Sequence, residues 1–251
     1  MIFDQKSRRV HLRRESGYDK RESGLWSVKI GMSKIGDQVV PLRRETLQTG
    51  VYARLCDLIL QGGIAPGESI TVATLATAFG VSPMPVREAL TRLTAAGALT
   101  VVSGRTIGVP KLTRERLDDL RRVRLEIETI AAEWAAGNTT ADFTAELERR
   151  YGRLVESEDA DDAKMYVEAN YEFHFAVYRQ SRSPTLFSII ESLWLQVSPF
   201  FHLLRESGNF RISNDHHAKL FRAMVDGDRA SARAAIVSDI DDAYAILAKL
   251  V

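Results

Sequence analysis

Hydrophobic positions in the second half of the chain recur at helical spacing. Between residues 112 and 251, apolar side chains return every three or four positions in six runs. Thr113 can cap the first run, which ends at Gly137, and Asp228 can cap the last. The acidic stretch 156–162 breaks the apolar pattern between the second and third runs. We predict an antiparallel bundle of six helices with no further strand.

The pattern before this bundle consists of three shorter helical runs. The first two cover residues 46–60 and 71–79, and Gly80 suits the C-terminal end of the second. A third helix begins abruptly after Gly80. Ser82 is placed to cap it, and Pro83 sits where a missing N–H is harmless. Two helices joined by such a tight turn are typical of a helix-turn-helix.

A short hairpin follows the third helix. Residues 97–102 and 106–109 are rich in β-forming side chains, and Ser103-Gly104-Arg105 joins them. We therefore predict a mostly α chain in two domains. Residues 41–111 form a winged helix-turn-helix of three helices and a β-hairpin wing. Residues 112–251 form the all-α, antiparallel six-helix bundle.

The third helix presents a short polar and basic face. Its buried stripe begins at Val86, so Arg87 and Thr91 can point away from the core. Recognition helices read base edges from their N-terminal residues, and wings contact phosphate or the minor groove. An ordinary solvated surface would show similar charge. The candidate DNA contacts are Arg43, Arg54, Ser82, Met84, Arg87, Thr91, Arg92 and Arg105.

These residues resemble the winged-helix domain of the GntR transcription regulators. The shared positions are Pro66-Gly67, Leu75-Ala76, Gly80-Val81-Ser82, Pro85-Val86-Arg87-Glu88-Ala89-Leu90, Leu93 and Gly97. The resemblance implies double-stranded DNA as a partner. Pro83-Met84 stands where many members have Arg followed by Thr, so one base-reading Arg is absent. The operator sequence of relatives therefore does not transfer to this chain.

Charge is divided unevenly between the two predicted domains. The formal net charge is +1, but residues 1–111 hold 16 basic and 9 acidic side chains, and residues 112–251 hold 18 and 24. A basic first part suits phosphate, whereas an acidic second part can coordinate cations or simply remain soluble.

Cysteine usage and hydropathy indicate the compartment. The single Cys56 excludes an intrachain disulfide and suits core packing in a reducing environment. No run approaches the roughly 18 apolar residues of a membrane span, and the N-terminus lacks the apolar block of a signal peptide. We expect a cytoplasmic, nucleoid-associated protein without a membrane partner.

The first forty residues carry basic side chains scattered among Ser and Gly, with almost no periodicity. We interpret residues 1–40 as a basic, disordered extension. Such an arm could follow the minor groove or add non-specific affinity for DNA. Met32 offers an alternative start of translation, in which case the preceding stretch would be a start-site artefact. Both explanations stay open.

Several polar residues fall on the inward side of the predicted bundle. Asn170 and His174 are four residues apart and share a helix face. His217 and Asp239 each lie eleven residues from Asp228, so a hairpin turning there brings them to the same height. Four donors could thus converge on one metal ion. Each residue taken singly could also be an ordinary hydrogen-bonded core residue.

The same four positions resemble the metal-binding positions of the FCD ligand-binding domain, found in the FadR-like subfamily of GntR regulators. The usual pattern has an acid at the first position and His at the other three. Here Asn170 stands at the first position and Asp239 at the fourth, so the carboxylate has moved from the first position to the fourth. The resemblance implies a divalent metal, and Zn, Ni, Fe and Mn all suit such donors. His202 and His216 are alternative donors.

Arg124 and Glu128 resemble another FCD pattern, on the first helix of that domain. Their spacing fits an intrahelical ion pair. Arg124 could instead face a cavity and bind the carboxylate of an effector. Tyr171 is a second candidate for the effector site, although aromatic residues here more often form a core.

The resulting hypothesis is a DNA-binding regulator rather than an enzyme. We expect a metabolite-responsive repressor that binds a pseudo-palindromic operator as a homodimer, with a small organic acid as its effector. Two alternatives remain: an architectural DNA-binding dimer without an effector, and a metallohydrolase using the His, His, Asp donors. No additional general base or nucleophile motif near His174 or His217 supports the hydrolase.

Overall fold

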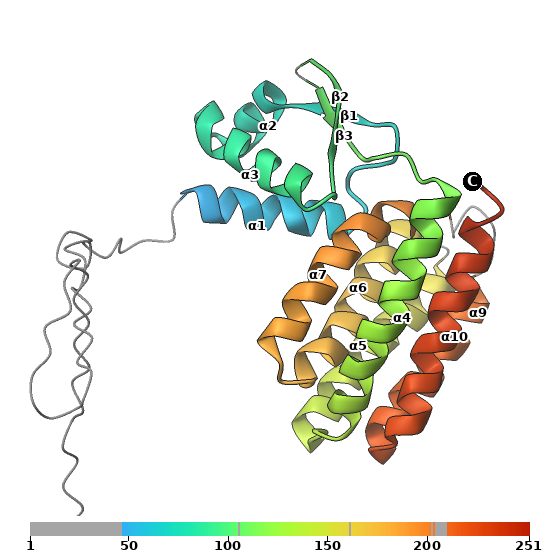
Figure 1. Cartoon of the computed structure of the whole chain (residues 1–251). Helices are drawn as coiled ribbons and strands as arrows, with labels where there is room; N and C mark the ends of the chain where they lie inside the picture. Colours follow the sequence, from blue (N-terminus) through green and yellow to red (C-terminus); the bar gives the residue numbers. More distant parts are fainter. Residues whose placement is uncertain (1–46, 105, 161, 202, 204–209) are drawn as a thin grey trace, which may run out of the picture. The chain divides into compact units, whose positions relative to one another are not determined.

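The computed structural model describes residues 47–104, 106–160, 162–201, 203 and 210–251, all within one unit of the chain (Figure 1). The predicted N-terminal extension, Arg43, Arg105 and His202 therefore lie outside the described residues.

The N-terminal region combines three helices with a small sheet. Helix α1 spans Leu47–Leu60, α2 spans Val72–Phe79 and α3 spans Pro83–Ala95. Strands β1 (Ser69–Thr71), β2 (Thr100–Ser103) and β3 (Thr106–Gly108) form an antiparallel sheet in the order β1-β3-β2. Three helices and a hairpin were predicted, and the winged helix-turn-helix is confirmed.

The turn between α2 and α3 follows from a few local residues. The Thr71 hydroxyl accepts a hydrogen bond from the Thr74 amide and caps α2. Gly80 has φ +65° and ends α2 in the left-handed conformation that glycine adopts without strain. Pro83 occupies the first position of α3, as predicted, whereas the Ser82 side chain makes no capping hydrogen bond. The recognition helix therefore starts on proline geometry rather than on a serine cap.

Six described α-helices form the second region. They are α4 (Arg114–Ala136), α5 (Ala141–Asp159), α6 (Ala163–Gln180), α7 (Pro184–Val197), α9 (Phe210–Asp226) and α10 (Arg229–Leu247), and the short 3-10 helix η1 (Ser198–Phe200) follows α7. Side chains of Thr113, Thr140, Asp162, Ser183 and Asp228 cap five of them. Figure 1 shows these helices running side by side as a bundle.

Two details differ from the predicted pattern. Strand β1 was not predicted, because three residues are too few to show an alternating pattern; pairing of Ile70 with Ile107 defines it. Helix α5 continues through most of the acidic stretch to Asp159 instead of ending before it. Glu156 is exposed and Glu158 is half-buried in this last turn, and the helix ends shortly before Asp162 caps α6.

Aromatic side chains of α6 and α7 fill the centre of the bundle. Phe173, Phe175, Tyr178 and Trp194 are among the largest fully buried side chains. The Phe175 and Tyr178 rings both lie within 6.2 Å of the Trp194 ring, centroid to centroid. This apolar shell makes the few polar groups inside it expensive unless each finds a partner. No helix among the described residues combines the length and hydropathy needed to cross a bilayer.

Candidate functional site

Three ligand-type side chains from three helices meet inside the bundle. His174 comes from α6, His217 from α9 and Asp239 from α10, and their ligand atoms all lie within 4.8 Å of one another. The two Nε2 atoms are 3.0 Å apart. The Asp239 carboxylate oxygens lie 3.5 Å from Nε2 of His174 and 3.7 Å from Nε2 of His217. The α9–α10 hairpin turns at Gly227. His217 and Asp239 are equally far from Asp228 in sequence, so they lie at the same height on the two antiparallel helices.

The far side of the His217 ring is held by an amide. Its Nδ1 lies 3.2 Å from Oδ1 of Asn214, one turn earlier on α9. The Asn214 amide nitrogen donates to the Glu158 carboxylate, which orients the amide oxygen toward the ring. An amide oxygen only accepts hydrogen bonds, so Nδ1 of His217 carries the proton. Nε2 of His217 then presents a lone pair toward the site.

The far side of the His174 ring is held by a phenol. Nδ1 of His174 lies 3.3 Å from the Tyr178 hydroxyl, and that hydroxyl donates to Glu128 at 2.5 Å. Burial, followed by the charge of Glu128, raises the pKa of Tyr178 well above its usual value, so the phenol keeps its proton. Its single proton is used on Glu128, so Nδ1 of His174 is the donor. Nε2 of His174 therefore also presents a lone pair.

In these charge states the two Nε2 atoms and the Asp239 carboxylate are all hydrogen-bond acceptors. Burial lowers the pKa of His174 to about 3 and also lowers the pKa of His217, so both rings are neutral at pH 7. Two lone pairs 3.0 Å apart beside a carboxylate repel one another. Two nitrogen ligands bound at about 2.1 Å to one metal lie roughly 3.0 to 3.4 Å apart, so the arrangement fits a divalent cation.

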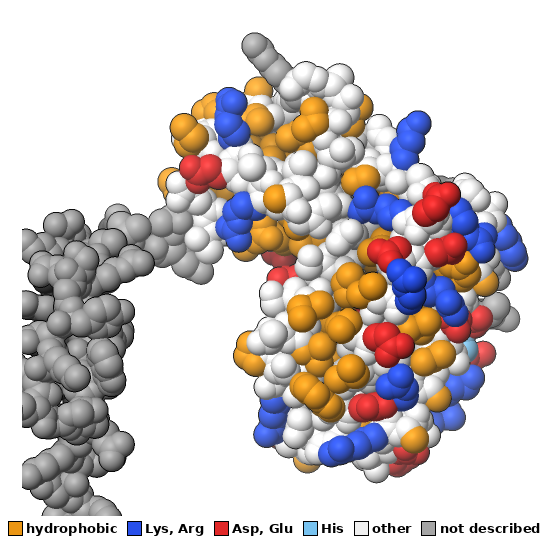
Figure 2. All heavy atoms as spheres, in the orientation of Figure 1, with side chains coloured by type: hydrophobic (Ala, Val, Ile, Leu, Met, Phe, Trp, Pro, Cys, Tyr) orange, Lys and Arg blue, Asp and Glu red, His pale blue; other side chains and the backbone are white. Residues whose placement is uncertain are grey.

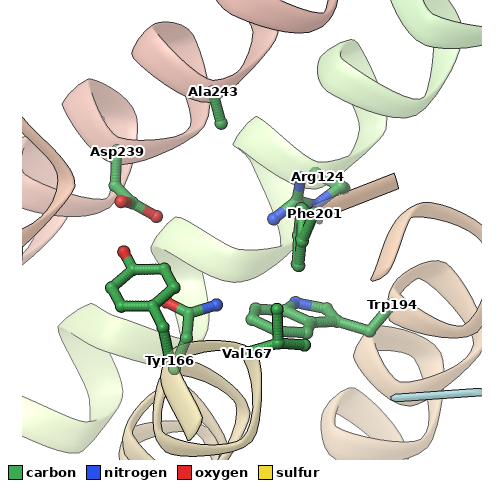
Figure 3. A pocket seen from close by; sticks show the side chains of 8 residues that line it. Arg124, Tyr166, Val167, Trp194, Phe201, Asp239 and Ala243 are labelled. Carbon is green, nitrogen blue, oxygen red and sulfur yellow. The ribbon is translucent and has the colours of Figure 1, made fainter. Parts of the chain in front are cut away.

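A pocket adjoins this cluster. It is small, with a cavity volume of about 20 Å³. Figure 3 shows Asp239 and Tyr166 on one side and Arg124, Phe201 and Trp194 on the other. Its lining residues are Arg124, Tyr166, Val167, Asn170, Trp194, Phe201, Asp239 and Ala243. Asn170, the predicted fourth donor, thus lines the same pocket as Asp239.

Arg124 forms the predicted ion pair and also lines the pocket. Its Nε lies 2.5 Å from Oε1 of Glu128, in a pair that is buried on both sides. Burial alone lowers the pKa of Arg124, but the neighbouring Glu128 carboxylate outweighs this effect, so the pKa of Arg124 is raised. Arg124 also lines the pocket. Tyr171, the other predicted effector residue, is not among the lining residues and packs 4.3 Å from the Phe175 ring, centroid to centroid.

His216 belongs to a different interaction. Its Nε2 lies 2.6 Å from Oδ2 of Asp242 on α10, and it is not part of the group formed by His174, His217 and Asp239. Adjacent residues on a helix point about 100° apart, so His216 and His217 cannot share one small site easily.

The predicted DNA-reading face lies along α3. Ser82, Met84, Arg87, Thr91 and Arg92 are all exposed, as is Arg54 on α1. The Thr91 hydroxyl donates to the Arg87 carbonyl at 2.8 Å. The Arg92 guanidinium lies 3.6 Å from the centre of the Tyr52 ring on α1. Their contacts with DNA stay a prediction.

The outer partners of the two histidines were missed by the sequence analysis. Tyr178 follows His174 by four residues, and Asn214 precedes His217 by three. Both spacings place a hydrogen-bonding group beside the ring on the same helix face. That signal was present, but it becomes specific only once the inward face is known.

The fold and the site define the class: a winged helix-turn-helix protein with a second, helical domain in which a small pocket adjoins a His-His-Asp cluster. Residues 47–109 match the gntR family of bacterial regulatory proteins, and residues 119–242 match the FCD domain. The chain is 31% identical to the HTH-type transcriptional regulator McbR of Escherichia coli K12, over 74% of this chain and 86% of that protein.

Further similarities agree. The solved structure of E. coli McbR/YncC aligns with a TM-score of 0.75 and 30% identity, covering 82% of this chain and 98% of that one. The "Probable D-xylose utilization operon transcriptional repressor" of Paenarthrobacter nicotinovorans is 24% identical, over 79% of this chain and 88% of the relative. The chain belongs to the GntR family and carries a C-terminal FCD domain. It is a DNA-binding transcriptional regulator, not an enzyme.

Proposed function

We propose that this regulator is a homodimeric repressor controlled by a small organic acid, which binds next to a divalent metal in the helical domain. Residues 41–111 bind the operator, and residues 112–251 sense the effector and form the dimer. His174, His217 and Asp239 bind the metal, with Asn170 as a fourth donor. Arg54, Ser82, Met84, Arg87, Thr91 and Arg92 face the DNA.

The arrangement of the two imidazoles carries the metal proposal. Both Nε2 atoms act as acceptors and face each other at 3.0 Å, since both Nδ1 protons are donated outward. Two buried imidazole lone pairs that face each other with no proton between them cost free energy. A divalent cation removes that cost and uses the Asp239 charge.

The pocket supports an acidic effector. Arg124 and Asp239 both line it, so a guanidinium and the proposed metal lie across one cavity from each other (Figure 3). Guanidinium binds a carboxylate through two parallel hydrogen bonds, and a metal can take a second oxygen of the same molecule. Phe201, Trp194 and Val167 give the remaining walls an apolar character, so the chemistry of the lining suits a short acid with a small hydrocarbon part.

An apolar face on the helical domain supports the homodimer. Val123, Ile127, Ile130 and Trp134 recur every three or four residues along α4, with Trp134 46% exposed. Ile189 on the neighbouring α7 is 44% exposed. Figure 2 shows hydrophobic side chains gathered over this region. Exposed apolar patches of this kind mark interaction surfaces, and two-fold symmetry lets one patch serve both copies.

Repression is the proposed sign of action because one relative is named as a repressor of a sugar-utilization operon. In a dimer, two recognition helices must match two half-sites. An effector that favours another pose of these helices weakens operator binding, and the two affinities are then reciprocally linked.

The test uses the full chain. Metal-free protein is titrated with Zn²⁺ and Ni²⁺ by calorimetry, and the metal-loaded protein is then titrated with di- and hydroxycarboxylic acids. An operator selected from random DNA reports release by each acid. We expect stoichiometric metal binding that the pair of substitutions H174A and H217A removes. Undiminished metal binding by that variant would contradict the site, and operator binding unaffected by any acid would favour the architectural alternative.

A further inference from the structure

A single arginine connects the helical domain to the end of the recognition helix. Arg116 lies in the first turn of α4, and its Nη2 donates to the Gly97 carbonyl at 2.6 Å. The same nitrogen lies 3.2 Å from Oε1 of Gln196 on α7. Three segments of the chain therefore meet at one half-buried guanidinium.

The Gly97 carbonyl lies directly after the end of α3 and is tied to it by hydrogen bonds. Ala96 ends α3, and the amide of Ala98 closes back onto the Leu93 carbonyl at 3.0 Å. Gly97 adopts φ +71°, and a Cβ at this position would lie 3.3 Å from Oε1 of Gln196. Glycine is therefore needed both for the backbone conformation and for the close approach of Gln196.

The other end of the connection reaches the ligand pocket. Arg116 and Arg124 share α4, and Arg124 lines the pocket. Gln196 follows Trp194, another lining residue, by two positions on α7. The Gln196 amide nitrogen donates to the Ser192 carbonyl, which holds its oxygen toward Arg116. Helices α4 and α7 thus each carry one residue that lines the pocket and one residue that holds Gly97.

The connection has an unusual cost. Nε of Arg116 is buried without a hydrogen-bond partner among the described residues. Burial also lowers the pKa of this guanidinium. A buried donor without a partner is rare in proteins and calls for an explanation. A second contact between the two regions is a simple hydrogen bond, in which the Ser198 hydroxyl donates to the Ile59 carbonyl at the end of α1.

We propose that Arg116 is a positioning residue for DNA recognition, which sets the orientation of α3 on the helical domain and so the half-site spacing that a dimer accepts. The inference rests on the proposed dimeric binding to an operator. Replacing Arg116 should therefore reduce the selectivity for half-site spacing but leave the binding of α3 to a single half-site unchanged.

The test compares the wild-type chain with R116M, R116K and Q196A. The control is R122M, on the same helix, where the side chain is 78% exposed and pairs with Asp119. Binding is measured to a single half-site and to operators whose half-sites are moved apart or together by one and two base pairs. Thermal unfolding monitors folding.

For the wild type and R122M, we expect a one-base-pair change of spacing to cost about tenfold or more in affinity. R116M binds the single half-site like the wild type but discriminates spacings at least about fivefold less, R116K recovers part of the selectivity, and Q196A shows a smaller loss. If R116M does not fold, Q196A decides. Unchanged spacing selectivity in the folded variants would overturn the role of Arg116. A wild-type chain that binds one half-site as tightly as two would overturn the dimeric function and the inference together.

Discussion

His174 and His217 face each other with their Nε2 atoms 3.0 Å apart, while the opposite nitrogen of each ring is bound to an oxygen of its own helix. The two outer contacts set both tautomers. They turn two ordinary buried histidines into a pair of ligands directed at one point. The tautomers, more than the proximity, distinguish this arrangement from a hydrogen-bonded histidine pair.

Replacing the outer partner should therefore weaken metal binding without removing a ligand. We expect N214A to lower the affinity for Zn²⁺ by about 10- to 100-fold, because His217 loses the acceptor that sets its tautomer. Calorimetric titration of the metal-free chain measures this. H216A is the matched control, since His216 pairs with Asp242 instead. Equal losses in the two variants would mean that the effect is one of general destabilisation.

The buried pair of Arg124 and Glu128 should be expensive to break. E128A leaves the guanidinium without its partner and removes the acceptor of the Tyr178 hydroxyl. We expect the free energy of unfolding to fall by about 3 to 5 kcal/mol. Urea denaturation of metal-free protein measures it.

The control for that prediction is the surface pair Arg122 and Asp119, with side chains 78% and 63% exposed. D119A should change the free energy of unfolding by less than about 1 kcal/mol. Similar values for E128A and D119A would show that the buried pair contributes no more than a solvated one.

The sequence predicted those features that depend on short-range spacing. Helical periodicity and capping residues such as Thr113 and Asp228 define the helices, and equal distances from Asp228 bring His217 level with Asp239. The side chains that line the pocket were harder to predict from the sequence. Tyr166 lines the pocket and Tyr171 does not, because five residues rotate a helix by about 140°, which carries the second ring onto another face. Which face looks inward depends on neighbouring helices, and a single helix sequence does not contain that information.

Arg87 should contribute to operator recognition but not to folding. It is exposed on α3, and R87A removes a candidate contact to guanine or phosphate. We expect a loss of about 1 to 3 kcal/mol in operator affinity, or roughly 5- to 150-fold, with an unchanged thermal unfolding midpoint. Fluorescence anisotropy with the selected operator checks this. R122M is the control for loss of one positive charge, and operator affinity retained by R87A would exclude Arg87 from the interface.

Met84 should read the methyl group of a thymine. It is 60% exposed at the start of α3, three and seven residues before Arg87 and Thr91, so all three share the outward face. An exposed methionine on a polar face is well suited to the thymine 5-methyl group, the apolar feature of the major groove. Each thymine of the selected operator is replaced in turn by deoxyuridine, which deletes that methyl alone.

For the wild type we expect one thymine per half-site to be sensitive, with a loss of about 0.8 kcal/mol, or roughly fourfold, for each methyl removed. M84A should bind both forms of that DNA equally, because the methyl group then meets no side chain. The R87A variant supplies the comparison, since it should keep the sensitivity to deoxyuridine while binding more weakly overall. If M84A retained the full sensitivity at the same thymine, another residue would be reading that base.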